Sequence, residues 1–321
     1  METKRPMIVL TGPTAVGKTK LSLALAKAVN GEILSADSVQ VYRHMDIGSA
    51  KIRQEEMQGI PHHMIDILDP WEPFNVVIFK RRCEECLADI YERGHIPIVA
   101  GGTGFYIQAL LRDVDFTENE ENTEYREYLE KLAKEKGPKH LNGMLAKVDP
   151  VSAQTIHSNN IKRTVRALEF YHLTGEPISG HNAKERRKAN AYQSCYFVLN
   201  DARERLYERI EKRVDEMLEQ GLLDEVKRLR EMGCTRDMVS MQGLGYKELS
   251  AFLEGEIPYD EAVSLIKRNT RHFAKRQLTW FRKEQNVIWV DKPEFDYDEG
   301  RILEYMMVKL RERGVLCNSP L

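Results

Sequence analysis

A glycine-rich segment near the start of the chain has the spacing of a phosphate-binding loop. Its sequence, Gly12-Pro-Thr-Ala-Val-Gly-Lys-Thr19, fits the pattern G-x-x-x-x-G-K-[ST]. Backbone N–H groups of such a loop close around phosphate oxygens, the lysine adds a positive charge, and the final hydroxyl can hold Mg²⁺. We therefore predict a di- or triphosphate site in which Lys18 and Thr19 take part in the chemistry and Thr19 holds the metal. The predicted binding residues are Gly12, Pro13, Thr14, Ala15, Val16, Gly17, Lys18 and Thr19.

Asp37 is the second candidate, because it ends the short apolar run 32–37. If that run is a parallel strand, its carboxyl end opens onto the same cleft as the phosphate loop. A carboxylate there could accept a proton from a nucleophile brought up to a phosphate ester. A turn-forming Asx cap explains the same residue, so both interpretations stay open.

Arg213 is the third candidate, at the edge of an apolar helix face. In the helical pattern 203–220, Leu206, Ile210 and Val214 share one stripe, Arg213 borders it, and Lys212 points away. A guanidinium in that position either extends to the surface or reaches into a cleft, where an anionic leaving group would favour it.

Two basic segments indicate a partner with a phosphate backbone. Residues 267–283 hold seven Lys or Arg and no acid, and Lys267, Arg271 and Lys275 lie four apart on one helix face, next to aromatic residues. We predict nucleic-acid contacts for Arg271 and Lys275. A second cluster contains Lys162, Arg163, Arg166 and the cations of 184–188. Solvated helix faces remain the alternative for both.

The elements around these residues predict an α/β fold. Apolar runs at 6–11, 32–37 and 96–100 are expected strands, and helical patterns at 18–29 and 76–93 separate them. This alternation predicts a P-loop parallel-sheet core flanked by helices. From 124 to 174 the pattern is only helical, and strand patterns return at 192–199 and 287–290. We therefore expect an all-helical insertion at 116–189, within a core formed by 1–115 and 190–321 that carries basic C-terminal helices.

Composition excludes several classes of protein. The 321 residues are 42% hydrophobic and 31% charged, which suits a folded chain and not a disordered one. The net charge of −2 gives no chain-wide attraction to nucleic acid or membranes. No signal segment and no apolar run of membrane-spanning length is present, so we expect a cytoplasmic protein without membrane contact. The five scattered cysteines indicate reduced thiols.

Taken together, these segments resemble the bacterial tRNA dimethylallyltransferases, also called tRNA isopentenyltransferases. The resemblance runs from about Val9 to Arg282. The chain departs from the family pattern at His44, Ser49 and Ile52, where glycine, threonine and proline are usual, which concerns local loop geometry. Besides the phosphate loop, the most specific parts are 35–43 with 45–48, 61–63, 101–104, 243–247 and 274–280.

The resemblance implies an enzyme that moves a dimethylallyl group from dimethylallyl diphosphate to the exocyclic amine of the adenosine 3′ to the tRNA anticodon. The loop at 12–19 would hold the diphosphate with Mg²⁺, Asp37 would be the base, and Arg213 would stabilise the departing diphosphate. The insertion would contact tRNA, and no stable protein partner is implied, which fits a monomer. Positions that match tRNA-contacting regions are Asp37, Ser38, Val39, Gln40, Thr103, Lys162, Arg163, Thr164, Val165, Arg166, Gln242, Gly243, Leu244, Gly245, Tyr246 and Lys247.

Three other functions compete with this one. A P-loop small-molecule kinase would use the same loop with ATP, but the strand at 96–100 ends in glycines instead of a Mg²⁺-binding acid. An adenylate dimethylallyltransferase would use the same donor on a free nucleotide, which leaves the basic segments without a role. A nucleic-acid-binding protein without catalysis leaves Asp37 and Arg213 without one.

Overall fold

The computed structural model describes residues 4–116 and 123–316, which divide into two compact units. The first unit joins the chain up to Leu111 with the chain from Ala191 onward, and the second unit is Arg112–Asn190. In the part of the chain that is described, no helix is both long and apolar enough to cross a membrane.

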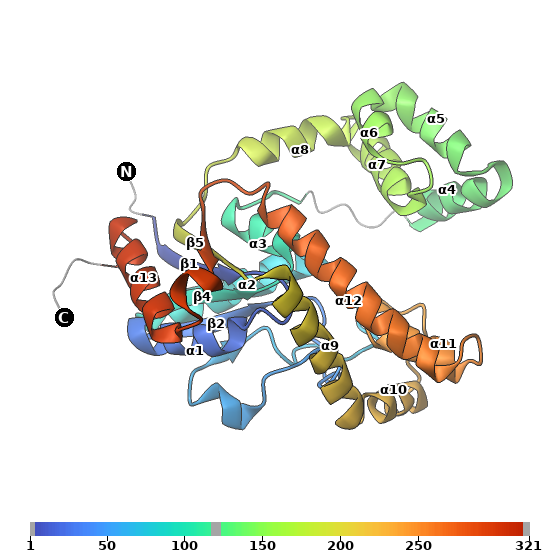
Figure 1. The fold of residues 1–321 in the computed structure, drawn as a ribbon. Coiled ribbons are helices and arrows are strands. Elements are labelled where there is room, and N and C mark those ends of the chain that lie inside the picture. The colour runs from blue at the N-terminus through green and yellow to red at the C-terminus, as the bar shows by residue number, and fades with distance from the viewer. Residues whose placement is uncertain (1–3, 117–122, 317–321) are drawn as a thin grey trace. The chain divides into compact units, whose positions relative to one another are not determined.

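A parallel sheet forms the centre of the first unit (Figure 1). Each pair of neighbouring strands runs parallel, as the sequence predicts, and the order across the sheet is β3-β2-β4-β1-β5-β6. Parallel strands place all their carboxyl ends at one edge, where ligands bind in folds of this class. The strands are β1 (Pro6–Thr11), β2 (Gly31–Ala36), β3 (His62–His63), β4 (Ile96–Gly101), β5 (Gln193–Asn200) and β6 (Val287–Asp291).

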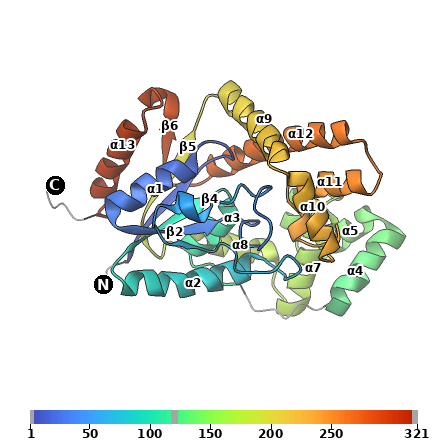
Figure 2. The same cartoon turned by 90° about the horizontal axis from the view of Figure 1, so that it is seen from below.

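Side-chain alternation along the strands gives the sheet two apolar faces. In β1, Met7 and Val9 pack into one core cluster, whereas Ile8 and Leu10 pack into the other. Helices α2 (Val76–Glu92) and α3 (Gly104–Leu111) cover the first face, and α1 (Lys18–Val29) and α13 (Glu299–Glu312) cover the second (Figure 2). Because both faces are covered, most side chains of the central strand β1 are buried and apolar.

Four more helices complete the first unit: α9 (Arg203–Glu219), α10 (Leu222–Glu231), α11 (Tyr246–Leu253) and α12 (Tyr259–Phe281). Helices α9 and α12 pack side by side. Lys267 is ion-paired with Asp215 at 2.6 Å, and Arg271 with Glu211. The expected unbroken positive face is therefore wrong at these two residues, because α9 supplies acids that the sequence of α12 does not show.

The described residues of the second unit form helices and no strand, as predicted. Its apolar core is built around Leu129, Leu141 and Leu145. The buried Asp149 caps α6 and also accepts hydrogen bonds from the backbone and hydroxyl of Ser179. The helices are α4 (Thr123–Lys136), α5 (Pro138–Val148), α6 (Pro150–Thr155), α7 (Ile161–Thr174) and α8 (Ile178–Arg187).

Candidate functional site

The phosphate loop lies between β1 and α1, at the carboxyl edge of the sheet. The ammonium of Lys18 folds back over the loop and donates to the carbonyl oxygens of Gly12 at 3.0 Å and Pro13 at 2.8 Å. The pKa of Lys18 is lowered to about 8 by burial first and by the positive charge of Arg213 second, while the carboxylate of Asp37 raises it. Lys18, Arg213 and Asp37 are thus within electrostatic reach of one another.

Asp37 makes the turn-capping contacts that one interpretation of the sequence predicts, and its role as a base stays a prediction. Its Oδ1 accepts hydrogen bonds from the backbone N–H groups of Val39 at 2.8 Å and Gln40 at 3.3 Å, which makes it an Asx cap. Its Oδ2 has no hydrogen-bond partner among the residues that the structure describes. One oxygen therefore fixes the carboxylate, and the other can accept a proton.

Arg213 is a half-buried cation without a carboxylate partner in the described chain. Its neighbours on α9, Leu206, Ile210 and Val214, are buried in the core. Burial lowers the pKa of Arg213, and the charge of Arg209 lowers it further, while the charges of Glu216 and Asp37 raise it. A guanidinium held in this way gains from an added anion.

A pocket of about 80 Å³ opens beside the loop. Hydroxyl and carboxylate oxygens of Thr19, Ser35 and Asp37 line it, and these are the donors that Mg²⁺ prefers. Within the described residues no three His, Cys, Asp or Glu side chains gather as a metal site. The donor set therefore suits an ion that also takes oxygens from a phosphate ligand. Gln40, Ile52 and His62 also line the pocket.

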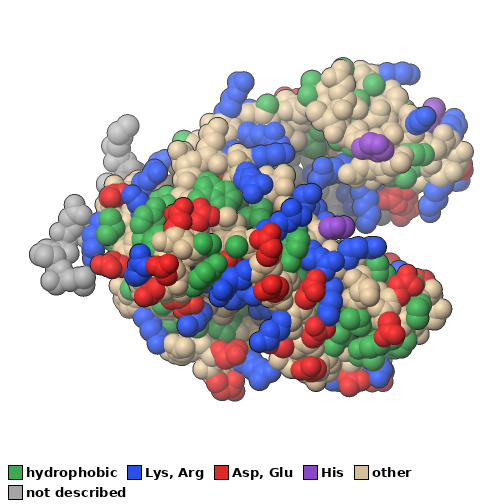
Figure 3. Space-filling model, viewed as in Figure 1, with side chains coloured by type: hydrophobic (Ala, Val, Ile, Leu, Met, Phe, Trp, Pro, Cys, Tyr) green, Lys and Arg blue, Asp and Glu red, His purple; other side chains and the backbone are tan. Residues whose placement is uncertain are grey.

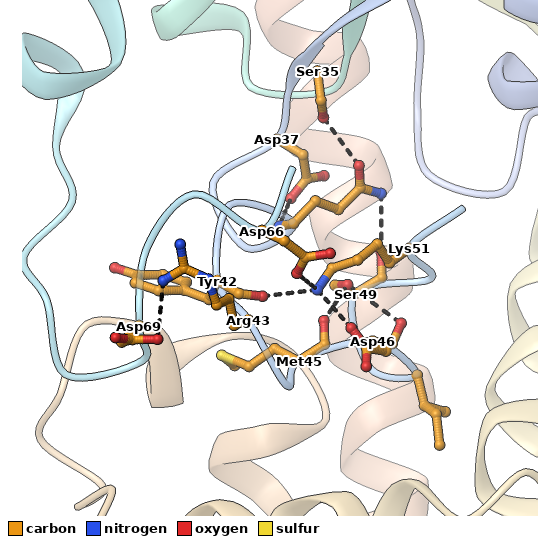
Figure 4. A network of polar contacts seen from close by, with 12 residues as sticks. Ser35, Asp37, Tyr42, Arg43, Met45, Asp46, Ser49, Lys51, Asp66 and Asp69 are labelled. Atoms are coloured by element: carbon orange, nitrogen blue, oxygen red, sulfur yellow. Dashed lines mark hydrogen bonds and ion pairs between the residues drawn. The ribbon is translucent and has the colours of Figure 1, made fainter. Parts of the chain in front are cut away.

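The segment after β2 is fixed by a network of polar contacts (Figure 4). Ser35 donates to the side-chain oxygen of Gln40 at 2.9 Å, and the amide of Gln40 donates to the carbonyl of Ser49 at 3.2 Å. The buried ammonium of Lys51 joins Asp46 and Asp66, each at 2.6 Å. These contacts hold one wall of the pocket in place.

Three departures from the family pattern are accommodated in this segment. His44, where glycine is usual, adopts a left-handed φ of 67°, which costs a non-glycine residue conformational energy. The hydroxyl of Ser49 donates to the carbonyl of Met45 at 2.6 Å. Ile52 is buried and lines the pocket. The segment after β2 therefore accommodates His44, Ser49 and Ile52 in place of the usual residues.

Glu225 of α10 anchors the backbone of residues 46–48. Its buried carboxylate accepts hydrogen bonds from the backbone N–H groups of Asp46, Ile47 and Gly48, at 2.8 to 3.1 Å, and from the hydroxyl of Tyr246. A Cβ at position 48 would lie 2.5 Å from the Tyr246 ring, so glycine is required there. The motifs 45–48 and 243–247, far apart in the sequence, thus meet at one carboxylate.

Gln277 of α12 ties the phosphate loop to the end of β4. Its side-chain oxygen accepts from the backbone N–H of Thr14 at 2.9 Å, and its amide donates to the carbonyl of Gly102 at 3.0 Å. One turn later, the Trp280 ring lies against Gly104, where a Cβ would come within 2.2 Å of the indole. This explains why the motifs 101–104 and 274–280 occur together.

The residues predicted to contact tRNA divide by exposure. In the first unit, Gln242 is exposed, while Ser38, Val39, Gln40, Thr103, Gly243, Leu244 and Lys247 are partly exposed. Gly245 and Tyr246 are buried, so a direct contact by the Tyr246 side chain is wrong, because that ring supports the 45–48 segment. Lys275 is exposed and has no carboxylate partner in the described chain.

In the second unit, Lys162, Arg163 and Arg166 are exposed on α7, although Arg166 also pairs with the buried Glu169 at 3.0 Å. Thr164 and Val165 are buried in that unit's interior. The prediction that these two side chains contact tRNA is therefore wrong, because both lie on the buried face of α7. The three cations remain available on the surface.

Several supporting residues were missed in the sequence. Glu225 and Gln277 are single polar residues inside helical patterns, and only tertiary packing reveals their roles. Glu32 is fully buried and binds Arg93, His63 and His95. The hydrogen bonds from Arg93 first, and then from the two histidines, outweigh burial and lower the pKa of Glu32 to about 2. An acid inside an apolar strand was the available signal.

Comparison with known proteins gives a consistent result. Residues 40–284 fit the model of the IPP transferase family, and residues 6–67 fit that of isopentenyl transferases. A tRNA dimethylallyltransferase from Lachnoclostridium phytofermentans is 57% identical over 97% of this chain and 99% of that protein. A crystal structure of the full-length tRNA isopentenylpyrophosphate transferase from Bacillus halodurans is 43% identical, covers 97% of this chain and 98% of its own, and has a TM-score of 0.72.

A eukaryotic dimethylallyltransferase acting on tRNA, known from crystallographic snapshots, is also similar. It is 32% identical, with a TM-score of 0.78 over 89% of this chain and 74% of its own chain. The similarity to these proteins extends across both units of the chain.

Proposed function

This chain belongs to the IPP transferase family, and we propose on that basis that it is a tRNA dimethylallyltransferase. The donor is dimethylallyl diphosphate, and the acceptor is the exocyclic amine of the adenosine 3′ to the anticodon. The products are the alkylated tRNA and diphosphate. One observation carries this reaction. The carboxylate of Asp37, whose Oδ2 has no hydrogen-bond partner among the described residues, raises the pKa of both Lys18 and Arg213, so the proposed base lies close to the two proposed diphosphate-binding cations.

The bonding changes assign a role to each group. The amine nitrogen forms a bond to C1 of the dimethylallyl group, and the C1–oxygen bond breaks with its electron pair leaving on diphosphate. Asp37 accepts the amine proton through Oδ2, while Oδ1 stays bound to the backbone of Val39. Lys18 and Arg213 stabilise the negative charge that develops on the leaving diphosphate.

Mg²⁺ is the cofactor that this proposal includes. When bound, it would neutralise part of the diphosphate charge. Thr19 would hold it through the side-chain hydroxyl, together with oxygens of the diphosphate. Thr19 is exposed at the pocket and free to bind a ligand from that side.

The tRNA acceptor accounts for the positive charge outside the pocket. Lys and Arg side chains gather over α12 (Figure 3), and Lys162, Arg163 and Arg166 are exposed on α7. A base in an anticodon loop must leave its stack before its amine can reach a pocket. We propose a cytoplasmic protein that acts on tRNA without a stable protein partner.

Two alternatives keep the phosphate loop but change the substrates: a free adenylate as acceptor, or ATP as the donor to a small molecule. The second is disfavoured because β4 ends at Gly101 and is followed by Gly102, with no acid where a kinase would hold its metal.

Labelled dimethylallyl diphosphate tests the proposal directly. The protein is incubated with the label, Mg²⁺ and, in separate reactions, unmodified tRNA, AMP or ATP. Label is expected on tRNA alone, at the adenosine 3′ to the anticodon. Label on AMP with none on tRNA would replace the acceptor, and no transfer to any acceptor would overturn the proposal.

A further inference from the structure

Phe105 is an exposed aromatic residue at the edge where the candidate site lies. It occupies the first turn of α3, two residues after Thr103, and 44% of its surface is accessible. Large apolar side chains are usually buried, and a single exposed one is not by itself evidence of a binding site. The residues around Phe105 supply the further evidence.

A partly buried indole supports the ring. Trp280 of α12 meets Phe105 edge to face, with ring centroids 6.2 Å apart and an interplanar angle of 74°. The indole itself is held against Gly104, where no side chain could fit. Such a pair costs little conformational entropy when one of its faces binds a ligand.

Helix α12 also fixes the distance between this ring pair and the phosphate loop. Gln277, one helical turn before Trp280, bonds both Thr14 and Gly102. These contacts therefore fix the position of Phe105 relative to the phosphate loop and to Asp37, which follows β2.

Two cations lie near Trp280 in the sequence. Arg276 precedes it by four residues on α12, Lys283 follows it by three residues just after the end of that helix, and both are exposed. Neither has a carboxylate partner in the part of the chain that the structure describes, although Arg276 also rests over the Phe273 ring. Lys267 and Arg271, farther along α12, are already neutralised by acids of α9.

From these contacts we propose that Phe105, supported by Trp280, is a stacking platform for an unpaired nucleobase adjacent to the alkylated adenosine. An aromatic face bordered by cations is the combination that binds single-stranded nucleic acid, because the ring stacks on a base while the cations meet the backbone. Every base has a π-face, so the platform would accept any neighbouring base. This inference rests on the proposed function and adds a residue to acceptor recognition.

Anisotropy binding with a fluorescent anticodon stem–loop hairpin tests the platform. Phe105→Ala and Phe105→Leu should each weaken binding about 5- to 100-fold, whereas Phe105→Tyr should restore it, because stacking needs an aromatic ring. Val308→Ala is the matched control, since Val308 on α13 is equally exposed at 43%. Thermal unfolding of each variant monitors the fold.

Abasic hairpins identify the partner of the ring. Removing the base on the 5′ or the 3′ side of the target adenosine should weaken binding by the wild type at one of these positions, and Phe105→Ala should show no further loss there. Equal losses for Phe105→Ala on all hairpins would overturn the platform. So would unchanged RNA binding with a raised KM for dimethylallyl diphosphate, which would assign the ring to the donor.

The label-transfer reaction separates this outcome from the proposed function. If wild type alkylates tRNA and Phe105→Ala binds the hairpin normally, only the platform is wrong. If wild type alkylates no tRNA, the proposed function itself fails.

Discussion

Tyr246 donates a hydrogen bond of 2.7 Å to the buried carboxylate of Glu225. The same carboxylate accepts three backbone N–H groups of the segment 46–48, which leads into the pocket wall at Ser49 and Gln40. The charge of Glu225 and burial raise the pKa of Tyr246 well above its usual value, with burial as the larger cause. The carboxylate of Glu225 on α10 therefore links α11 to the loop at 46–48.

Replacing this acid should destabilise the protein. Glu225→Ala leaves three backbone donors and one hydroxyl without an acceptor, and we expect a loss of about 3–5 kcal/mol in the free energy of unfolding. Tyr246→Phe removes a single hydrogen bond to a charged group, so about 1.5–3 kcal/mol is expected. Urea unfolding of both variants measures these losses. A loss under about 1 kcal/mol for Glu225→Ala would show that the carboxylate is not an anchor.

Asp37→Asn separates the base from the cap. The amide oxygen can still accept from Val39 and Gln40, so the turn should persist, but the side chain cannot take up a proton. We expect turnover to fall by about two to four orders of magnitude with little change in the affinity for donor or tRNA. Single-turnover kinetics and binding assays provide the two readouts. Near-normal turnover would leave Asp37 with its capping role alone.

Arg213→Ala should slow the reaction about 10²- to 10³-fold, because a donor to the developing diphosphate charge is lost. Lys212→Ala is the matched control: its side chain is 78% exposed and pairs with Glu216 at 3.6 Å. Steady-state kinetics should place the loss in kcat for Arg213→Ala and show no more than about a twofold change for the control. Equal effects of the two variants would point to helix stability instead of leaving-group chemistry.

The pH dependence of diphosphate binding should follow Lys18. Its pKa of about 8 lies below the ordinary 10.5, so the free protein loses this charge as the pH rises through 8. The affinity for inorganic diphosphate with Mg²⁺ should be constant below pH 7 and fall by up to about tenfold per pH unit above 8. Calorimetry from pH 6.5 to 9.5 measures it, with Lys18→Met correcting for titration of the ligand. A parallel decline in both proteins would exclude Lys18 as the titrating group.

The sequence predicted the elements that carry the site because each has a strong local pattern. The run 6–11, the glycine loop and the helix 18–29 coincide with β1, the phosphate loop and α1. Strand β3 has only two residues, His62 and His63, and is half-buried, so no alternation marks it. Short strands of this kind form only through pairing with a neighbour, here β2.

Side-chain environments were harder to predict than elements. The run 267–283 contains no acid, yet Lys267 and Arg271 are neutralised by Asp215 and Glu211, which lie on another helix. Tyr246 belongs to a motif of a tRNA-binding family, yet its side chain is buried on Glu225. In both cases the decisive contact joins residues distant in sequence, which periodicity along one segment does not encode.

The salt dependence of tRNA binding should distinguish the cations of α12 by their ion pairs. Lys275 is exposed and has no carboxylate partner in the described chain, whereas Lys267 donates to Asp215 at 2.8 Å. A free lysine that meets a phosphate releases a counterion on binding, and a paired one must first give up its acid. Lys275→Ala should therefore lower the slope of log affinity against log salt by about 0.7 to 0.9, while Lys267→Ala should change it little.

Arg271 extends this comparison, since the sequence singled it out together with Lys275 and the structure pairs it with Glu211. Arg271→Ala should behave as Lys267→Ala does, with a nearly unchanged slope. Filter binding of tRNA between about 50 and 200 mM salt gives all three slopes. If Arg271→Ala flattens the slope as much as Lys275→Ala, the pair with Glu211 opens in the complex and Arg271 contacts the backbone after all. If none of the three changes it, the tRNA backbone does not follow this face of α12.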